Sequence, residues 1–144
     1  MTFFVDTNVL VYAAGEGEYR EPCLELLRAI AAGGAEGKTS TAVLEEAWHV
    51  ELSGRAGTLS GLARRSYALF TPLLSVTDET VSLAFSLDGG ALGANDRIHV
   101  ATCVINGVDT IVTADAGFDG IRGLRRIDPL DRRALSDLAE QRSG

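Results

Sequence analysis

The stretch TFFVDTN, residues 2–8, passes directly from an apolar run to three polar residues. The run from Thr2 to Val5 has the length and composition of a buried β-strand. Asp6 would then stand at the carboxyl end of that strand, with Thr7 and Asn8 beside it. An aspartate at such a junction is either the cap of the next helix or part of a site, and its position alone favours neither.

Helical and strand patterns alternate along the rest of the chain. The patterns predict helices at 8–14, 21–32, 41–52, 60–70, 78–87 and 95–106, and strands at 38–40, 73–76, 110–113 and 125–127. Strands separated by helices need crossover connections, so we expect an α/β fold, a three-layer α/β/α sandwich around a central, mainly parallel sheet of about four to five strands. Ligands of such sheets bind beyond the carboxyl ends of the strands, where Asp6 lies.

Length and composition indicate one domain over residues 1–144. The chain has 144 residues, of which 46% are hydrophobic, and this is enough apolar material for one core. Cys23 and Cys103 lie far apart without a CxxC pattern, so we interpret both as thiols that fill the core. Neither a signal-peptide pattern nor a run of about 18 apolar residues occurs, so we expect a cytoplasmic protein without a membrane span.

The net charge limits the classes of nucleic-acid partner. A formal charge of -7 argues against a protein that coats nucleic acid nonspecifically, because phosphate binding usually needs a basic face. A nuclease remains compatible, since an acidic site attracts phosphate once it holds divalent cations. Near the C-terminus, arginines form either an ordinary solvated surface, the simpler interpretation, or a phosphate-facing patch. These arginines are Arg122, Arg125, Arg126, Arg132 and Arg133.

Two further aspartates lie where a site is expected. Asp115 follows the predicted strand 110–113, and Asp96 opens a strongly apolar helix. Val100 and Cys103 stand at i+4 and i+7 from Asp96, so its carboxylate points along an apolar face. A buried charge needs a partner, a metal ion or a shifted pKa. Capping of the helix N-terminus, shared with Asn95, is the alternative interpretation.

The predicted helix 41–52 offers a fourth acid, either Glu45 or Glu46. Val43 and Val50 place Glu46 at the rim of the apolar stripe, whereas Glu45 aligns with His49. Spacing therefore favours Glu46 only by a narrow margin, and either residue could be an ordinary surface glutamate.

The types of side chain favour a hard cation. Several carboxylates that converge without lysines repel one another, whereas oxygen ligands suit Mg²⁺ or Mn²⁺. His49 and His99 form neither an HxxxH nor an HxH pattern, so zinc is not expected. The pattern also gives no support for a histidine general base.

Three stretches together resemble a known family. They are FFVDTNVLVY at 3–12, STAVLEEAW at 40–48 and LGANDRIHVATCVINGVDTIVTADAGFD at 92–119. In order and spacing they are similar to the motifs of PIN domains, and specifically of the VapC-type ribonuclease toxins of toxin–antitoxin pairs. The resemblance covers most of the chain, although residues 54–93 carry no motif.

The resemblance implies a function and a set of site residues. The implied metal ligands and catalytic residues are Asp6, Glu46, Asp96 and Asp115; Asp119 is an additional or water-mediated participant, and Asn8 and Thr113 orient the ligands. The implied reaction is hydrolysis of RNA phosphodiester bonds with Mg²⁺ or Mn²⁺ as the cofactor. A cognate antitoxin and a homodimer are also implied.

Two alternatives stand beside a metal-dependent endoribonuclease. A noncatalytic PIN-like scaffold that binds RNA or protein would be favoured by the loss of a ligand position, and none is lost. A phosphatase with Asp6 as its covalent nucleophile, in the manner of the haloacid dehalogenase group, needs a second aspartate two residues later. The residue there is Asn8, which disfavours this alternative.

Overall fold

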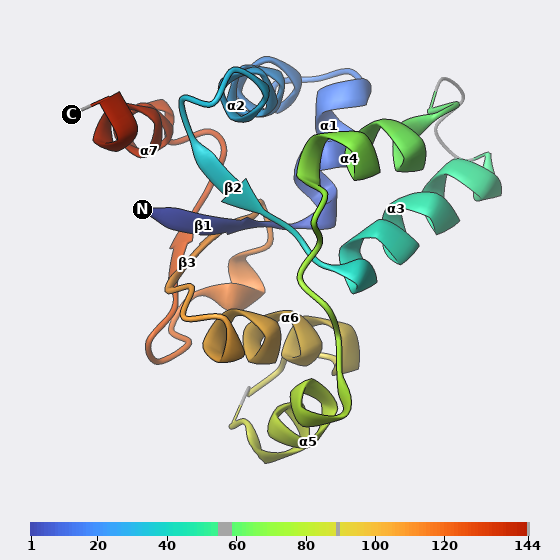
Figure 1. The fold of residues 1–144 in the computed structure, drawn as a ribbon, viewed down its shortest axis with the longest axis vertical. Helices are drawn as coiled ribbons and strands as arrows, with labels where there is room; N and C mark the ends of the chain where they lie inside the picture. The colour runs from blue at the N-terminus through green and yellow to red at the C-terminus, as the bar shows by residue number, and fades with distance from the viewer. Residues whose placement is uncertain (55–58, 89, 144) are drawn as a thin grey trace.

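The computed structural model describes residues 1–54, 59–88 and 90–143, and its centre is a parallel sheet (Figure 1). Four strands lie within the described residues: β1 (Thr2–Val5), β2 (Glu36–Lys38), β3 (Thr110–Val112) and β4 (Arg125–Ile127). They pair in the order β2-β1-β3-β4, and every pairing is parallel. The predicted fold class is therefore confirmed.

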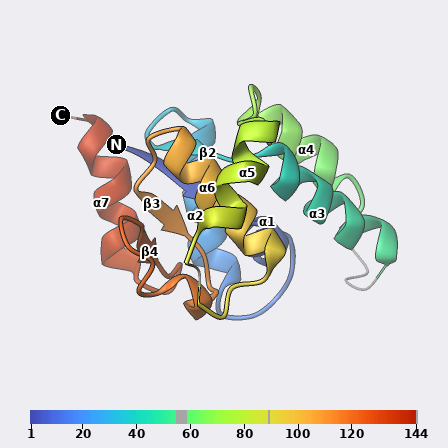
Figure 2. The ribbon, with the colours of Figure 1, turned by 90° about the horizontal axis from the view of Figure 1, so that it is seen from below.

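Helices cover both faces of the sheet. The described helices are α1 (Thr7–Ala14), α2 (Arg20–Ala31), α3 (Thr41–Ser53), α4 (Leu62–Phe70), α5 (Asp78–Ser86), α6 (Ala94–Ile105) and α7 (Arg132–Ser143), with a short 3-10 helix, η1 (Ala116–Phe118). In Figure 1, α1, α2 and α7 lie above the sheet and α5 and α6 below it. Figure 2, seen from below, shows α5 and α6 nearest the viewer. Phe3, Phe4 and Val5 of β1 are fully buried between these layers.

Two of the predicted strands differ from the structure. Strand β2 ends at Lys38, before the buried Thr39, whose hydroxyl donates to the carbonyl of Val5 over 2.7 Å. The segment 73–76 is not a strand and contributes a single parallel bridge, between Leu74 and Ser40. The backbone of Leu74 bonds to the backbone of Thr39 and Thr41, but the N–H of Val76 donates to the hydroxyl of Thr41 and not to a carbonyl. Hydrophobic periodicity does not reveal such a side-chain contact.

Helix α7 was not predicted from the sequence. Its strongly charged sequence offers only a narrow apolar stripe, which buries Ala134, Leu135 and Leu138. The helix packs against α2 (Figure 1). Contacts with another helix, more than its own periodicity, therefore stabilise it.

Both cysteines have the structural role that the sequence indicates. Cys23 and Cys103 are free and buried, and burial raises the pKa of each thiol to about 12. They are therefore inert thiols of the core. Across the described ranges, the helices are too short or too polar to cross a membrane.

The order of the strands places the candidate site. Strands β1 and β3 are neighbours, with Val5 opposite Val112, so the residues that follow them lie side by side. The chain leaves β1 for β2 on one side and later returns to β3 on the other. Such a reversal opens a crevice at the carboxyl ends of the strands. Asp6 and Thr113 lie there.

Candidate metal centre

Asp6 is fixed on both of its carboxylate oxygens. Its Oδ1 accepts from the backbone N–H of Thr7 over 2.8 Å, so it caps the start of α1. Its Oδ2 accepts from the hydroxyl of Thr113 over 2.7 Å, and Asn8 bonds the same hydroxyl over 2.9 Å. Asp6 is only 5% exposed. The structure thus combines the two interpretations of Asp6, because the aspartate that caps α1 also bonds Thr113 at the end of the neighbouring strand β3.

Glu46 is the glutamate that helix α3 turns toward Asp6. Ser40 caps α3 by accepting from the backbone N–H of Val43. Glu46 Oε2 then accepts from the hydroxyl of Thr7 over 2.7 Å, whereas Glu45 is exposed. The structure therefore decides between two glutamates that the spacing barely separates.

His99 brings helix α6 into the same cluster. The residue is completely buried, and its Nε2 lies 2.8 Å from Glu46 Oε1 and 3.7 Å from Asp6 Oδ1. One potential ligand atom from each of Asp6, Glu46 and His99 lies within 4.8 Å of the others. Three elements far apart in the sequence thus converge on one point.

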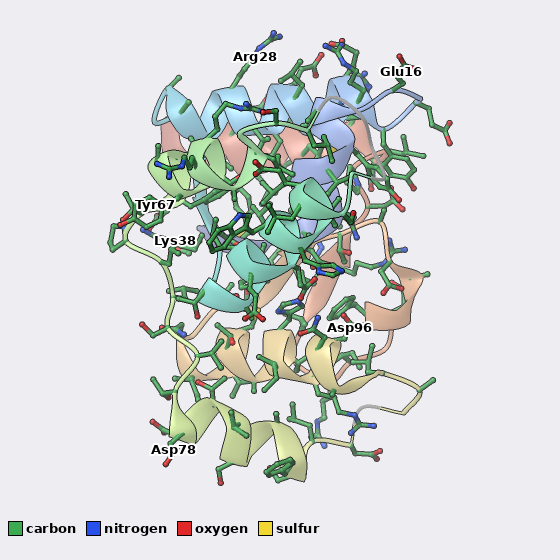
Figure 3. All side chains as sticks on the ribbon, turned by 90° about the vertical axis from the view of Figure 1, so that its right-hand side faces the viewer. Glu16, Arg28, Lys38, Tyr67, Asp78 and Asp96 are labelled. Carbon is green, nitrogen blue, oxygen red and sulfur yellow. The ribbon has the colours of Figure 1, made fainter. Side chains whose placement is uncertain are left out.

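Asp96 lies in the first turn of α6, one turn before His99. The N-cap of α6 is Gly93, and no side chain forms a capping hydrogen bond, so Asp96 does not cap the helix by hydrogen bonding; it does lie in the first turn, where the helix dipole favours its charge. Asp96 is labelled in Figure 3 above α6. Burial raises the pKa of Asp96, and the nearby charges of Asp6 and Glu46 raise it further.

The two acids that follow β3 differ in their surroundings. Asp115 Oδ1 accepts from the backbone N–H of Gly117 over 2.8 Å, and the charge of Asp115 acts on Asp96. Asp119 instead forms a bidentate pair with Arg126, whose Nε lies 2.7 Å from Oδ1. Hydrogen bonds from Arg126 lower the pKa of Asp119. Asp119 is therefore already neutralised by an arginine, whereas Asp115 is not bonded to one among the described residues.

The aspartates repel one another. Burial raises the pKa of Asp6 above its usual range, and the charge of Glu46 adds to this. Burial also raises the pKa of Asp96, and the charges of Asp6, Asp115 and Glu46 act in the same direction. Carboxylates whose ionised form is disfavoured in this way gain from a bound cation.

Glu46 and His99 form a coupled pair within this field. Burial raises the pKa of Glu46, but hydrogen bonding and charge from His99, with the bond from Thr7, outweigh it and hold the pKa below its usual value. Burial lowers the pKa of His99, and the bond to Glu46 and the charge of Asp6 reverse that effect. Glu46 is thus the acid of the cluster that is most easily kept ionised.

The donor atoms suit a divalent cation. Most of the available ligand atoms are carboxylate oxygens, which Mg²⁺ and Mn²⁺ prefer, and a single imidazole is also compatible with Mn²⁺. Asp6 and Glu46 are the predicted ligands whose oxygens converge here, whereas Asp96 and Asp115, also predicted from the sequence, lie outside that converging group. The raised pKa values of Asp6 and Asp96 fit a site that is completed by positive charge.

Sequence reasoning missed the contributions of His99 and Thr7. His99 stands three residues after Asp96, so both lie on the same face of α6, and this spacing was the available signal. Thr7 lies inside the DTN stretch but bonds Glu46, 39 residues away. No local pattern predicts a hydrogen bond of that separation.

A sheet with this order, and acids at the carboxyl ends of β1 and β3, defines an α/β protein with an acidic site at its topological switch point. The family model of the PIN domain matches residues 3–124. The chain belongs to the PIN domain family. The match includes the candidate residues from Asp6 to Asp119 and ends just before β4 and α7.

The known proteins that this chain is similar to include a ribonuclease and a toxin. The chain is 29% identical to Ribonuclease VapC7 of Mycobacterium tuberculosis, over 87% of this chain and 90% of that protein. Its structure is similar to VapBC2 of Rickettsia felis bound to a promoter DNA fragment, with a TM-score of 0.67, 18% identity and coverage of 89% and 98%. For VapC20 of Mycobacterium tuberculosis, a toxin that cleaves the sarcin-ricin loop, the TM-score is 0.62, with 21% identity and coverage of 85% and 98%.

Proposed function

We propose that this protein is a metal-dependent endoribonuclease and the toxin of a toxin–antitoxin pair. The observation that carries the proposal is the convergence of Asp6 and Glu46, with Asp96 and Asp115 beside them, at the carboxyl edge of the sheet. Membership of the PIN family and the likeness to Ribonuclease VapC7 support the choice of RNA as the substrate.

The residues of the chain have defined roles in this proposal. A divalent cation bound by the carboxylates would supply a water of lowered pKa and neutralise charge on the scissile phosphate. Thr113 and Thr7 hold the carboxylates of Asp6 and Glu46 in fixed orientations through bonds of 2.7 Å each. The carboxylates in turn orient the attacking water. Such preorganisation avoids the cost of arranging the site during the reaction.

The direct attack of water determines the products. Neither a covalent intermediate nor attack by the 2'-hydroxyl is required, so the products carry 5'-phosphate and 3'-hydroxyl ends. Analysis of the cleaved ends tests this step, and 2',3'-cyclic phosphate products would refute it.

Cleavage of a labelled total-RNA pool tests the activity. Purified protein is incubated with Mg²⁺ or Mn²⁺, with and without a chelator, beside the variants Asp96→Asn and Asp78→Asn. Asp78 is an exposed aspartate at the start of α5, far from Asp96 in Figure 3, and it controls for the loss of one charge. We expect Asp96→Asn to slow cleavage at least about 100-fold, because the rate falls about tenfold for each ~1.4 kcal/mol by which the activation free energy rises when the charge is lost.

The same experiment can favour the noncatalytic scaffold. Wild-type protein that is folded and free of any antitoxin, yet leaves every RNA intact, would contradict the enzymatic proposal. RNA binding without cleavage, unchanged by the chelator, would then support the scaffold.

We also propose a cognate antitoxin and a homodimer as the protein's partners. Several structures that the chain resembles are complexes of this kind, among them a toxin–antitoxin complex from Klebsiella pneumoniae with a TM-score of 0.63 and 19% identity over 88% of this chain and 96% of that one. An antitoxin would inhibit by covering the acidic site, with a basic residue against the carboxylates. Co-expression with the product of a neighbouring short reading frame tests it: we expect a stable complex without RNA cleavage. The homodimer is tested separately: light scattering measures the molar mass of the free protein in solution, and we expect twice the mass of one chain.

A further inference from the structure

His99 is a completely buried side chain within a polar cluster. It is 0% exposed, and its ring packs against Phe4 with centroids 5.6 Å apart. Nε2 faces Glu46 Oε1 at 2.8 Å, whereas Nδ1 is buried and has no hydrogen-bond partner in the described part of the chain. The two nitrogens of one ring thus have opposite surroundings.

This asymmetry indicates which nitrogen carries the hydrogen. A neutral imidazole has one N–H and one bare nitrogen. A hydrogen on Nδ1 would be a buried donor without an acceptor, which is unfavourable. A hydrogen on Nε2 is donated to a carboxylate at 2.8 Å. The surroundings therefore favour a ring with its hydrogen on Nε2.

The same asymmetry argues against His99 as a metal ligand. A ligating histidine nearly always donates its second ring N–H to a nearby acceptor, and His99 Nδ1 has no such acceptor among the described residues. An Nε2 that donates to Glu46 also has no lone pair left for a cation. In the cluster of Asp6, Glu46 and His99, the two carboxylates thus supply oxygen ligands, and His99 supplies a hydrogen-bond donor to Glu46.

We propose that His99 is a positioning residue, which holds Glu46 in its ligating orientation by donating from Nε2. The proposal rests on the metal-dependent function proposed above. His99 donates to Oε1 and Thr7 donates to Oε2. Hydrogen bonds from α6 and from α1 therefore fix the two carboxylate oxygens of Glu46. Each oxygen keeps a second lone pair for the cation.

Metal affinity of two variants tests the role. His99→Gln keeps an amide N–H that can reach Glu46, whereas His99→Met has a similar volume and no donor. Binding of Mn²⁺ is titrated by electron paramagnetic resonance, which needs no RNA cleavage. We expect His99→Met to weaken binding about 10–100-fold, as for other groups that orient metal ligands, and His99→Gln to remain within a few-fold of wild type. Equal binding by His99→Met and wild type would overturn the proposal, since His99 would then be only a core residue.

The matched control is the other histidine. His49 is exposed on α3 and, within the described residues, forms no hydrogen bond to Asp6, Glu46 or His99, so His49→Met should bind Mn²⁺ as wild type does. Melting curves in chelator show whether each variant is folded. If His99→Met is unfolded, His99→Gln and a measurement on the wild type decide the question.

That second measurement is long-range ¹H–¹⁵N correlation of the histidine rings in the wild type, with the His99 signals assigned from His99→Gln. We expect a hydrogen on Nε2 both without and with Mg²⁺. Loss of that hydrogen on adding Mg²⁺, together with weak binding by His99→Gln, would make His99 a direct ligand and refute the proposal.

Other outcomes bear on the proposed function and not on His99. Wild-type protein that binds no ion would refute the metal-dependent function itself, and normal ion binding without RNA cleavage would refute only the activity.

Discussion

Asp6 and Asp96 are costly to the protein when no cation is present. Both pKa values are raised, by burial first and then by neighbouring carboxylates. At neutral pH the carboxyl groups of Asp6 and Asp96 are therefore ionised in surroundings that disfavour a negative charge. Such an arrangement is poor for stability and suits the binding of positive charge.

Asp96→Asn should therefore stabilise the metal-free protein. We expect the free energy of unfolding in chelator to increase by about 1 kcal/mol near neutral pH, because the substitution removes one of the repelling charges. The stabilisation that Mg²⁺ or Mn²⁺ gives to the wild type should shrink in the variant. Melting curves with and without the cation measure both effects.

The pH dependence of this difference follows from the direction of the pKa shift. Because the folded pKa of Asp96 lies above the ordinary value of about 3.9, the folded chain binds the proton more tightly than the unfolded chain. The contribution of Asp96 to stability therefore falls as the pH rises above that value. The advantage of Asp96→Asn should be absent at low pH and grow with pH. A constant difference across the pH range would contradict the explanation.

Thr113 is the residue on which the orientation of Asp6 depends most directly. Its buried hydroxyl donates to Asp6 Oδ2 and accepts from Asn8 over 2.9 Å and from the backbone N–H of Asp115 over 3.1 Å. Thr113→Val keeps the shape and removes all three bonds. We expect a loss of about 1–3 kcal/mol in the free energy of unfolding, and about 10-fold weaker Mn²⁺ binding. Thr113→Ser, which keeps the hydroxyl, should restore most of the affinity, and its failure to do so would show that shape matters more than the bonds.

At the level of single residues, the sequence predicted the acids better than the groups that hold them. Asp6 was identifiable because it follows an apolar strand, and Asp96 because it opens an apolar helix. Glu46 could be distinguished from Glu45 by family resemblance, but hardly by spacing. His99 and Thr7 act on Glu46 from 53 and 39 residues away. Contacts of that kind arise only when the chain is folded.

At the level of elements, prediction succeeded where burial dominates and failed where neighbouring elements decide. Strand β1 is fully buried apart from Thr2, so its apolar run is a sufficient signal. Strand β2 is only partly buried, and its predicted position was two residues too late. Helix α7 was missed because its apolar stripe is narrow and gains its stability by packing on α2.

Arg97 links helix α6 to the segment that precedes it. Its guanidinium donates to the carbonyls of Leu87, Gly90 and Leu92 over 2.7, 3.1 and 2.9 Å. A planar fork can satisfy three carbonyls at once, whereas an ammonium group on a flexible stem cannot match that geometry. Arg97 therefore fixes the backbone just before the helix that carries Asp96.

Removal of this fork should loosen that backbone. We expect Arg97→Met to lower the free energy of unfolding by about 1–3 kcal/mol and to speed amide exchange around Leu87 and Leu92. Arg97→Lys should recover only part of the loss, since it keeps the charge without the fork. Hydrogen exchange followed by mass spectrometry measures both variants. Equal protection in Arg97→Met and wild type would show that the segment is held by other contacts.

At the level of the whole molecule, the acidic net charge and the proposed RNA substrate oppose each other. The chain carries a formal charge of -7. Of the C-terminal arginines, Arg126 is paired with Asp119 and Asp128, and Arg132 with Glu25 over 3.2 Å. These pairs neutralise part of the charge of the C-terminal arginines. Attraction of RNA should thus be local, at the cation-loaded site, and repulsion should be long-range.

Added salt should therefore weaken the binding of RNA far less than it does for basic nucleic-acid-binding proteins. The Debye length is about 30 Å at 0.01 M salt and about 8 Å at 0.15 M, so salt removes the long-range repulsion before it affects the site itself. At saturating Mg²⁺ we expect KM for a labelled RNA to stay level or fall a few-fold over this range. A protein that contacts many phosphates through a basic face would instead lose affinity steeply, by counterion release. A dinucleotide substrate serves as the control, because it is too short to sense the distant charges, and its KM should hardly change. A steep rise of KM for the long RNA alone would show that the arginine-rich surface, and not the acidic centre, dominates RNA binding.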